Sequence, residues 1–90
     1  MPKYAARVDA NQARIVAALR AAGATVQVLS AVGQGCPDLL VGRHGVNYLL
    51  ECKVEHGKLT PDEATWHDLW RGDVAIVRDE DDALRVVGAA

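Results

Sequence analysis

The sequence contains no phenylalanine, two tryptophans and two tyrosines, and its apolar half is built mainly from alanine and valine. Such side chains make a thin core in a chain of 90 residues, which is near the small end of what folds alone. We therefore expect a single domain over residues 1–90. Oligomerisation would add buried area, so a homodimer is the expected state.

Long apolar runs are also missing. None approaches the roughly 20 residues of a membrane-spanning helix, and the N-terminus lacks the apolar stretch of a secretory signal peptide. We expect a soluble cytoplasmic protein, with no membrane partner and no small-molecule cofactor.

Cysteine is scarce, and the two present, Cys36 and Cys52, fall on opposite faces of the hairpin described below. We expect both to be reduced, with no disulfide between them. They form no zinc set with the three histidines, which lie far apart in sequence. An enzyme based on cysteine is disfavoured, because Cys52 should face the core and Cys36 has no base near it in sequence.

A basic surplus is absent as well, since 10 Lys and Arg stand against 12 Asp and Glu. Nucleic-acid-binding proteins usually carry an excess of basic residues. A nucleic-acid partner would therefore have to be held by local basic patches and bound cations.

The sequence does contain a strong β-hairpin pattern over residues 35–53. Two apolar runs, residues 37–41 and 48–53, flank a turn with two glycines, which are able to take positive φ. Folding about the centre of that turn pairs Asp38 with Glu51. Side chains alternate along a strand, so Lys53 points to the same side as Glu51, and Cys52 to the other.

Two carboxylates facing each other in an apolar hairpin need a compensating charge. Opposed residues have Cβ atoms about 4.5–5.5 Å apart, a separation at which like charges repel. A divalent cation such as Mg²⁺ removes the repulsion, and Lys53 beside it could orient a metal-bound water or neutralise a phosphate. This pattern indicates metal-assisted phosphodiester hydrolysis. The alternative is a Pro-Asp turn entry and an ion pair of Glu51 with Lys53 on a solvated strand.

These residues also carry a family resemblance. Pro37-Asp38 followed by Glu51-Cys52-Lys53 matches the PD-(D/E)XK signature of the restriction-endonuclease-like superfamily. A longer ordered set, over residues 11–84, resembles the small phage-type nucleases of the virus-type replication-repair (VRR-NUC) group. That set comprises Gly35-x-Pro37-Asp38-Leu39-Leu40-Val41-Gly42, Leu50-Glu51-x-Lys53, Gly57-Lys58-Leu59-Thr60 and Trp66-His67-x-x-Trp70-x-Gly72.

The resemblance implies an α/β fold with a restriction-endonuclease-like core, in the order αβββαβα, whose mixed sheet is flanked by helices. It implies a Mg²⁺- or Mn²⁺-dependent DNA endonuclease of phage-type replication or repair, selective for branched or junction DNA, that leaves a 5′-phosphate and a 3′-hydroxyl. Asp38, Glu51 and the backbone carbonyl of Cys52 would hold the metal, and Lys53 would position the attacking water. The alternative is a non-catalytic nucleic-acid-binding or assembly module on the same scaffold.

The first helix is predicted over residues 10–22, with Asp9 as its N-cap. The nucleases that this chain resembles often carry a metal-binding glutamate on this helix. Here Gln12, or else Asn11, takes that place, and neither is a strong metal ligand. We expect a neutral water or DNA contact, or simply a polar surface pair.

The second helix is predicted from Pro61 to about Arg71, with Thr60 as N-cap and Glu63 completing a capping box. The nucleases that this chain resembles usually have glutamine at the position of Glu63. The Glu63 carboxylate therefore either caps the helix, adds to the metal site or repels a phosphate. His67 lies one turn further on, within reach of the same cleft, and is a candidate to contact a metal ligand or the DNA without binding the metal itself.

Two more features concern DNA contact. Lys58, in a polar loop after the hairpin, is placed to meet a phosphate or is simply solvated. Trp66 and Trp70 share a helix face, and we expect them to be core residues; the alternative is that one lines a DNA groove or a dimer seam.

The other elements follow from local patterns. Residues 24–29 and 73–78 are predicted as strands, the latter central or covered. The acidic residues 79–82 suit the first turn of a short helix, and residues 84–87 end the fold as a last short strand. Both ends, residues 1–8 and 88–90, are expected to fray.

Overall fold

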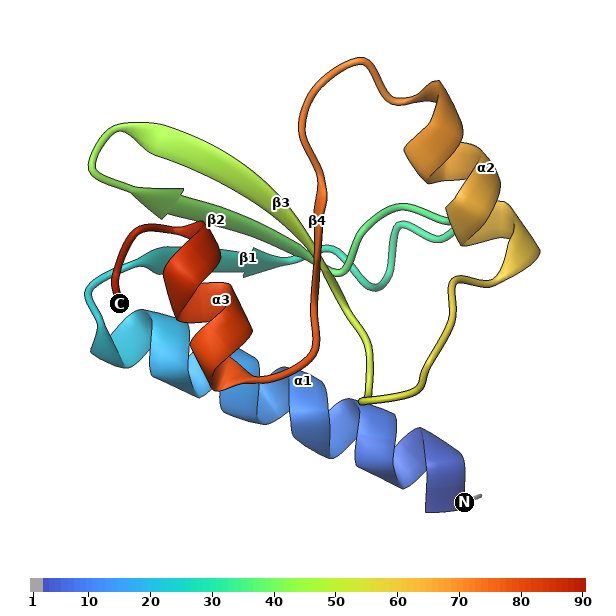
Figure 1. The fold of residues 1–90 in the computed structure, drawn as a ribbon, viewed down its shortest axis with the longest axis horizontal. Helices are drawn as coiled ribbons and strands as arrows, with labels where there is room; N and C mark the ends of the chain where they lie inside the picture. The colour runs from blue at the N-terminus through green and yellow to red at the C-terminus, as the bar shows by residue number, and fades with distance from the viewer. Residues whose placement is uncertain (1–2) are drawn as a thin grey trace.

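The computed structural model describes residues 3–90 of the chain, and Figure 1 shows its fold. Its elements are α1 (Lys3–Ala21), β1 (Thr25–Val28), β2 (Leu39–Arg43), β3 (Val46–Cys52), α2 (Pro61–Leu69), β4 (Ala75–Val77) and α3 (Glu80–Val86). The predicted αβββαβα order and the mixed sheet flanked by helices are confirmed.

The four strands form one sheet in the order β1-β2-β3-β4. The first three are antiparallel and β4 runs parallel to β3. Within the hairpin the predicted register is confirmed, since Val41 pairs with Tyr48. The chain reverses through His44 and Gly45, whose φ angles of 51° and 79° suit the tight turn of a two-residue hairpin.

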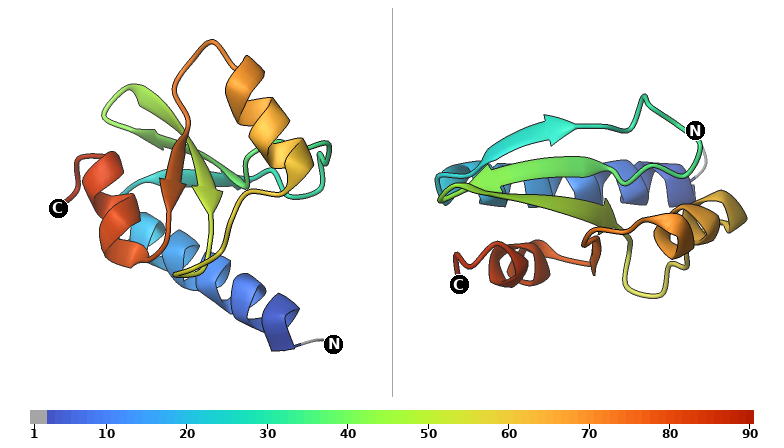
Figure 2. Two further views of the ribbon diagram at one scale, coloured as in Figure 1. Left: turned by 45° about the vertical axis from the view of Figure 1, so that its right-hand side comes forward. Right: turned by 90° about the horizontal axis from the view of Figure 1, so that it is seen from above.

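Helices α1 and α3 cover one face of the sheet, and the core lies between these layers (Figures 1 and 2). Alternate strand residues face this core and are buried; they are Leu39, Val41, Leu50, Cys52 and Val77, packed against Ile15 and Leu19 of α1. The opposite face is covered only near α2, so Leu40 and Ile76 remain 37% and 40% exposed. The carboxylates of the hairpin lie on this second face, in its covered part near α2, where Glu51 is only 1% exposed.

The first helix is longer than predicted. It begins at Lys3, so Asp9 lies inside it and is not its N-cap. Residues 3–8, expected to fray, are helical, and residues 1–2 lie outside the described residues. Residues 3–8 include alanine, lysine and arginine, which are good helix formers, and contain no glycine or proline. The helix can therefore extend N-terminal to Asp9.

The C-terminal segment also differs from the prediction. Residues 80–86 form α3, which excludes a last strand over residues 84–87. Asp79 caps this helix by accepting the Asp82 amide at 2.8 Å. The last residues are docked, because the Ala89 amide donates to the Leu84 carbonyl at 2.7 Å and Ala89 packs against the core. The acidic residues 79–82 thus serve the helix start, as predicted.

Strand β4 was predicted to be central or covered; it lies at an edge of the sheet, so a central position is wrong, and it is covered on one face only, with Val77 buried and Ile76 40% exposed. Its three residues pair only with β3, and their short length fits an edge strand that resists further pairing.

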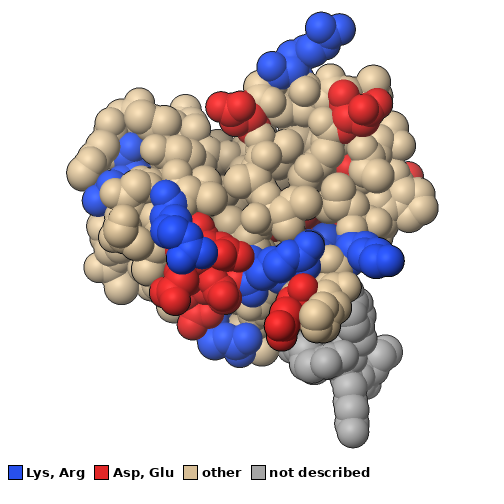
Figure 3. All heavy atoms as spheres, viewed as in Figure 1, with Lys and Arg blue, Asp and Glu red and all other residues tan. Residues whose placement is uncertain are grey.

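Charges are mixed on the face seen in Figure 3. Basic and acidic side chains intermingle over α3 and the neighbouring part of α1, and the upper part of this face is mostly uncharged. This view therefore shows no broad basic surface, as the balance of charged residues leads one to expect. Among the described residues, no helix combines the length and apolarity needed to cross a lipid bilayer.

Candidate active site

The hairpin brings Asp38 and Glu51 together where the β2–β3 pairing ends. The Asp38 carboxylate accepts the Cys52 amide at 2.8 Å through Oδ2. In the continued register Pro37 stands opposite Cys52, and proline has no N–H to donate to the Cys52 carbonyl. The Asp38 side chain thus accepts the last amide of the β2–β3 pairing. Because Pro37 has no N–H, the Cys52 carbonyl lacks the backbone donor that would otherwise pair with it.

Glu51 is the most deeply buried acid of this cluster, with a side chain only 1% exposed. The pKa of Glu51 is raised to about 9. Burial is the largest cause, followed by a hydrogen bond with Asp38 and by the charge of Asp38. Its Oε1 atom is buried and has no hydrogen-bond partner. A carboxyl in this position binds either a proton or a cation at neutral pH, so the site fits a divalent metal.

Lys53 lies between two carboxylates. Its Nζ atom is 3.9 Å from Glu51 Oε2 and donates to Glu63 Oε1 at 2.6 Å. Burial alone would lower the pKa of Lys53, but the bond to Glu63 and the nearby carboxylates raise it above its usual value. Lys53 is therefore a charged ammonium at neutral pH.

Glu63 caps α2 and holds Lys53 at the same time. Its Oε1 atom accepts the Thr60 amide at 2.8 Å, and its own amide donates to Thr60 Oγ1 at 3.2 Å, so the predicted capping box is confirmed. Burial alone would raise the pKa of Glu63, but its bonds to Lys53 and Thr60 lower it. Of the predicted roles, the structure shows the capping one.

His67 reaches the same cluster from α2. Its Nε2 atom lies 3.8 Å from Glu51 Oε1, and neither atom has a hydrogen-bond partner. The ring also makes an edge contact with Trp66, at a centroid distance of 6.0 Å and an angle of 70°. His67 thus lies beside Glu51, one turn after Glu63 on α2.

Gly35 sets the distance between the loop before β2 and helix α2. It has a positive φ of 81°, and a Cβ atom placed on it would collide with the backbone of Asp62 and Glu63. Only glycine allows this approach, which places Glu63 beside Lys53. The glycine of the motif therefore has a packing role that the sequence alone did not reveal.

On α1, the two candidate residues lie in different places. The Asn11 Nδ2 atom donates to the Lys53 carbonyl at 3.0 Å, and Asn11 is 4% exposed. Gln12 instead donates to Ser30 Oγ at 3.3 Å. The structure thus connects Asn11, and not Gln12, to the end of β3. Lys58 is exposed on its loop, as a phosphate-contacting residue would be.

The tryptophans are not core residues, so that prediction is wrong. No residue of α2 is buried, and Trp70 is 46% exposed. The rings of Trp66 and Trp70 stack on each other, with centroids 4.5 Å apart and an angle of 18°. The helix ends at the Trp70 cap, short of the predicted Arg71, and lies to one side beyond the end of the sheet.

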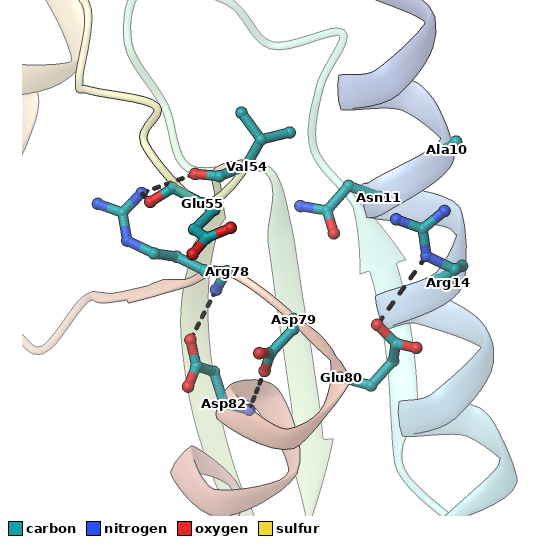
Figure 4. A pocket seen from close by; sticks show the side chains of 9 residues that line it. All are labelled: Ala10, Asn11, Arg14, Val54, Glu55, Arg78, Asp79, Glu80 and Asp82. Atoms are coloured by element: carbon teal, nitrogen blue, oxygen red, sulfur yellow. Dashed lines mark hydrogen bonds and ion pairs between the residues drawn. The ribbon is translucent and has the colours of Figure 1, made fainter.

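Sequence reasoning missed Arg78. Its guanidinium Nη1 donates to the carbonyls of Val54, Glu55 and Gly57 at 2.7, 3.2 and 2.9 Å, and so holds the loop that follows Lys53. Figure 4 shows Arg78 in a cavity of about 610 Å³ between α1, α3 and this loop. An arginine at the end of a strand carries no sequence signal for such a clamp.

Neither cysteine is suited to nucleophilic chemistry. Both are free thiols, as predicted. Burial raises the pKa of Cys52 to about 12, and burial with the charges of Glu51 and Asp38 raises the pKa of Cys36. Both thiols therefore stay protonated near neutral pH.

Within residues 3–90, no three His, Cys, Asp or Glu side chains gather closely enough to form a complete metal site. A cation here would depend on Asp38, Glu51 and the Cys52 carbonyl together with water and substrate oxygens. That is the usual environment of Mg²⁺, which keeps several waters and takes only one or two carboxylates.

Comparisons with known proteins find one similar structure. No family model and no curated protein matches the sequence. Among solved structures, the chain is similar to a "VRR_NUC domain", with a TM-score of 0.73 and 27% sequence identity, over 91% of this chain and 95% of that one. The similarity supports the nuclease-domain family that the sequence motifs indicated.

Proposed function

We propose that the chain is a metal-dependent DNA endonuclease of the PD-(D/E)XK type that hydrolyses phosphodiester bonds with Mg²⁺ or Mn²⁺. One observation carries the proposal: Asp38 and Glu51 converge, with a buried and unpartnered Glu51 oxygen, beside the Lys53 ammonium. The similarity to a VRR_NUC domain supports the same function.

Each residue has a distinct task in the proposed reaction. When bound, Mg²⁺ or Mn²⁺ stabilises charge on the phosphate and makes a bound water acidic. Asp38, Glu51 and the Cys52 carbonyl hold the cation. Because the Lys53 ammonium is charged, it donates hydrogen bonds to the attacking water or to a phosphate oxygen and does not act as a base. The products are a 5′-phosphate and a 3′-hydroxyl.

DNA contacts are proposed around this cluster. Lys58 is exposed in the loop that leads from β3 to α2, where it can contact a phosphate one or more nucleotides from the scissile bond. The small size and the phage-type resemblance support a role in replication or repair, with branched or junction DNA as the preferred substrate.

A homodimer is proposed through the open face of the sheet. Leu40, Leu49 and Trp70 line a shallow cavity of about 460 Å³ there, and a second copy would bury this apolar surface. Two copies would present two active sites to opposite strands, which suits a four-way junction. Light scattering tests the state: a mass of two chains supports it, and a single-chain mass at micromolar concentration contradicts it.

A nuclease assay tests the function. Plasmid, single-stranded and four-way-junction DNA are each incubated with the protein in Mg²⁺, Mn²⁺ or EDTA. We expect cleavage with either metal, none with EDTA, and the fastest cleavage on the junction. Binding of the junction without cleavage under every condition would instead favour the non-catalytic module, for which the engagement of Lys53 by Glu63 is the supporting observation.

A further inference from the structure

The loop between β1 and β2 contains a strained turn. Gln34 and Gly35 have φ angles of 57° and 81°, and the Cys36 amide donates to the Gly33 carbonyl at 3.1 Å. These are the features of a type I′ turn, whose two central positions take positive φ and favour asparagine, aspartate or glycine. Glutamine is an unfavourable residue at the first of these positions. Backbone strain of this kind is concentrated at functional sites, which directs attention to the Gln34 side chain.

The turn of the β2–β3 hairpin has nearly the same backbone but a different purpose. His44 and Gly45 have φ angles of 51° and 79°, and His44 and Gln34 are the non-glycine residues with positive φ among residues 3–90. A two-residue hairpin requires such a turn to reverse the chain. Residues 29–38 join β1 to β2, and a connection of this length does not require one. The joining of the strands therefore does not account for the strain at Gln34.

Gln34 lies beside the proposed active site. Its neighbour Gly35 packs so closely on the backbone of Asp62 and Glu63 that only glycine fits, and Figures 1 and 2 show this loop next to the start of α2. In the other direction the chain continues through Pro37 directly into Asp38, which is fixed by its bond to the Cys52 amide. The turn is thus anchored on both sides, and it presents the exposed Gln34 side chain from a fixed backbone.

The chemistry of this loop suits contact with a DNA base. Residues 29–37 carry no charged side chain, whereas the neighbouring cluster is acidic, so the loop does not repel DNA. The amide of Gln34 offers both donors and an acceptor. An amide of this kind pairs with the edge of a base, as glutamine does with N6 and N7 of adenine. Val32, in the same loop, is 63% exposed and offers an apolar contact for a thymine methyl group.

We propose that Gln34 contacts the edge of a base next to the scissile phosphate and gives the protein a preference for the base at that position. This inference rests on the proposed function, since it concerns the same DNA. The anchored turn holds the amide at a fixed place relative to Asp38, so the preference is confined to one or two positions beside the cleavage site.

Selection from a DNA pool tests the inference without cleavage. Four-way junctions with randomised bases beside the branch point are bound to the full chain in Ca²⁺, and the bound fraction is sequenced. In the wild type we expect one base to be enriched at least about fivefold at one position, and in Gln34→Gly less than about twofold. His44→Gly relieves the same kind of backbone strain far from the acids, so it should keep the wild-type enrichment. Neither variant should lower the urea midpoint, because glycine takes positive φ without strain.

The other outcomes overturn the inference. Equal enrichment in Gln34→Gly and the wild type, or no enrichment in the wild type, excludes a base contact by Gln34. Weaker binding of Gln34→Gly with an unchanged base preference indicates a phosphate contact instead. Incubation of the selected junctions with Mg²⁺ separates this inference from the proposed function. Cleavage by the wild type without a Gln34-dependent preference refutes the inference alone, and a Gln34-dependent preference in binding without any cleavage refutes the nuclease alone. Absence of DNA binding refutes both.

Discussion

Lys53 and Glu63 form the shortest ion pair of the site, at 2.6 Å, and the same Glu63 oxygen also accepts the Thr60 amide. A single carboxylate thus starts helix α2 and holds the ammonium that lies 3.9 Å from Glu51. The charge of Glu63 therefore sits beside the place where the proposed substrate phosphate would bind.

Replacing Glu63 by Gln should raise the cleavage rate. Glutamine keeps an oxygen for the Thr60 amide but removes the negative charge, which repels a phosphate and competes for Lys53. We expect an increase of about threefold or more in single-turnover rate, together with a lower urea midpoint, because the bond to Lys53 loses its charge. Glu55→Gln, an exposed neighbour, serves as the control. A fall in rate would mean that the Glu63 charge takes part in the reaction.

The stability of the metal-free protein should decrease as the pH rises. The pKa of Glu51 is raised to about 9 in the fold, from 4.5 in the unfolded chain. Below pH 4.5 both states keep this proton, and above it the unfolded state loses the proton first, so stability falls until about pH 9. Urea unfolding at several pH values measures this fall.

The variant Glu51→Gln removes that titration. At pH 8 without metal it should be roughly 1–3 kcal/mol more stable than the wild type. Millimolar Mg²⁺ should stabilise the wild type and leave the variant unchanged. If the unfolding free energy of the wild type changes between pH 5 and 8 in the same way as that of Glu51→Gln, Glu51 is not a buried carboxyl with a raised pKa.

Gly35→Ala should damage the site through packing. The added Cβ would strain a positive φ and collide with the start of α2. Gly33 is a matched control, because its φ of 77° is similar but its Cβ would meet nothing within 4 Å. Gly33→Ala should cost about 1–2 kcal/mol from backbone strain alone, and Gly35→Ala clearly more, with a large loss of cleavage. Equal effects of the two substitutions would refute the close approach.

Arg78→Ala should loosen the loop that follows Lys53. The guanidinium bonds to three carbonyls, and bonds to a charged donor are strong, so we expect a loss of about 2 kcal/mol or more in unfolding free energy. Hydrogen exchange of residues 54–57 should become faster. Arg85→Ala removes an exposed ion pair and should cost less than about 1 kcal/mol. If both substitutions lower the unfolding free energy by the same amount, Arg78 does not hold the loop in place.

The parts of the fold that could be predicted from sequence have local causes. The hairpin register follows from the turn glycines and the alternation of the two apolar runs, so the facing of Asp38 and Glu51 was predictable. The start of α2 follows from the Thr60-Pro61 pair and its capping box.

The parts that could not be predicted depend on how distant segments meet. The phase of α1 decides whether Asn11 or Gln12 contacts β3, and neighbouring helix positions differ in direction by about 100°. The exposure of Trp70 depends on how α2 lies beyond the end of the sheet, and its approach to the loop before β2 is limited by Gly35. Helical spacing alone showed only that the tryptophans share a face.

The central claim is that Asp38 and Glu51 hold a catalytic metal, and single-turnover cleavage by Asp38→Asn tests it most directly. Asparagine keeps an oxygen for the Cys52 amide, so the strand end stays closed while the charge is lost. Asp81→Asn, on the exposed side of α3, is the control. We predict a rate at least about 100-fold below wild type in Mg²⁺, with an unchanged circular dichroism spectrum. Cleavage by Asp38→Asn at the wild-type rate would contradict the account.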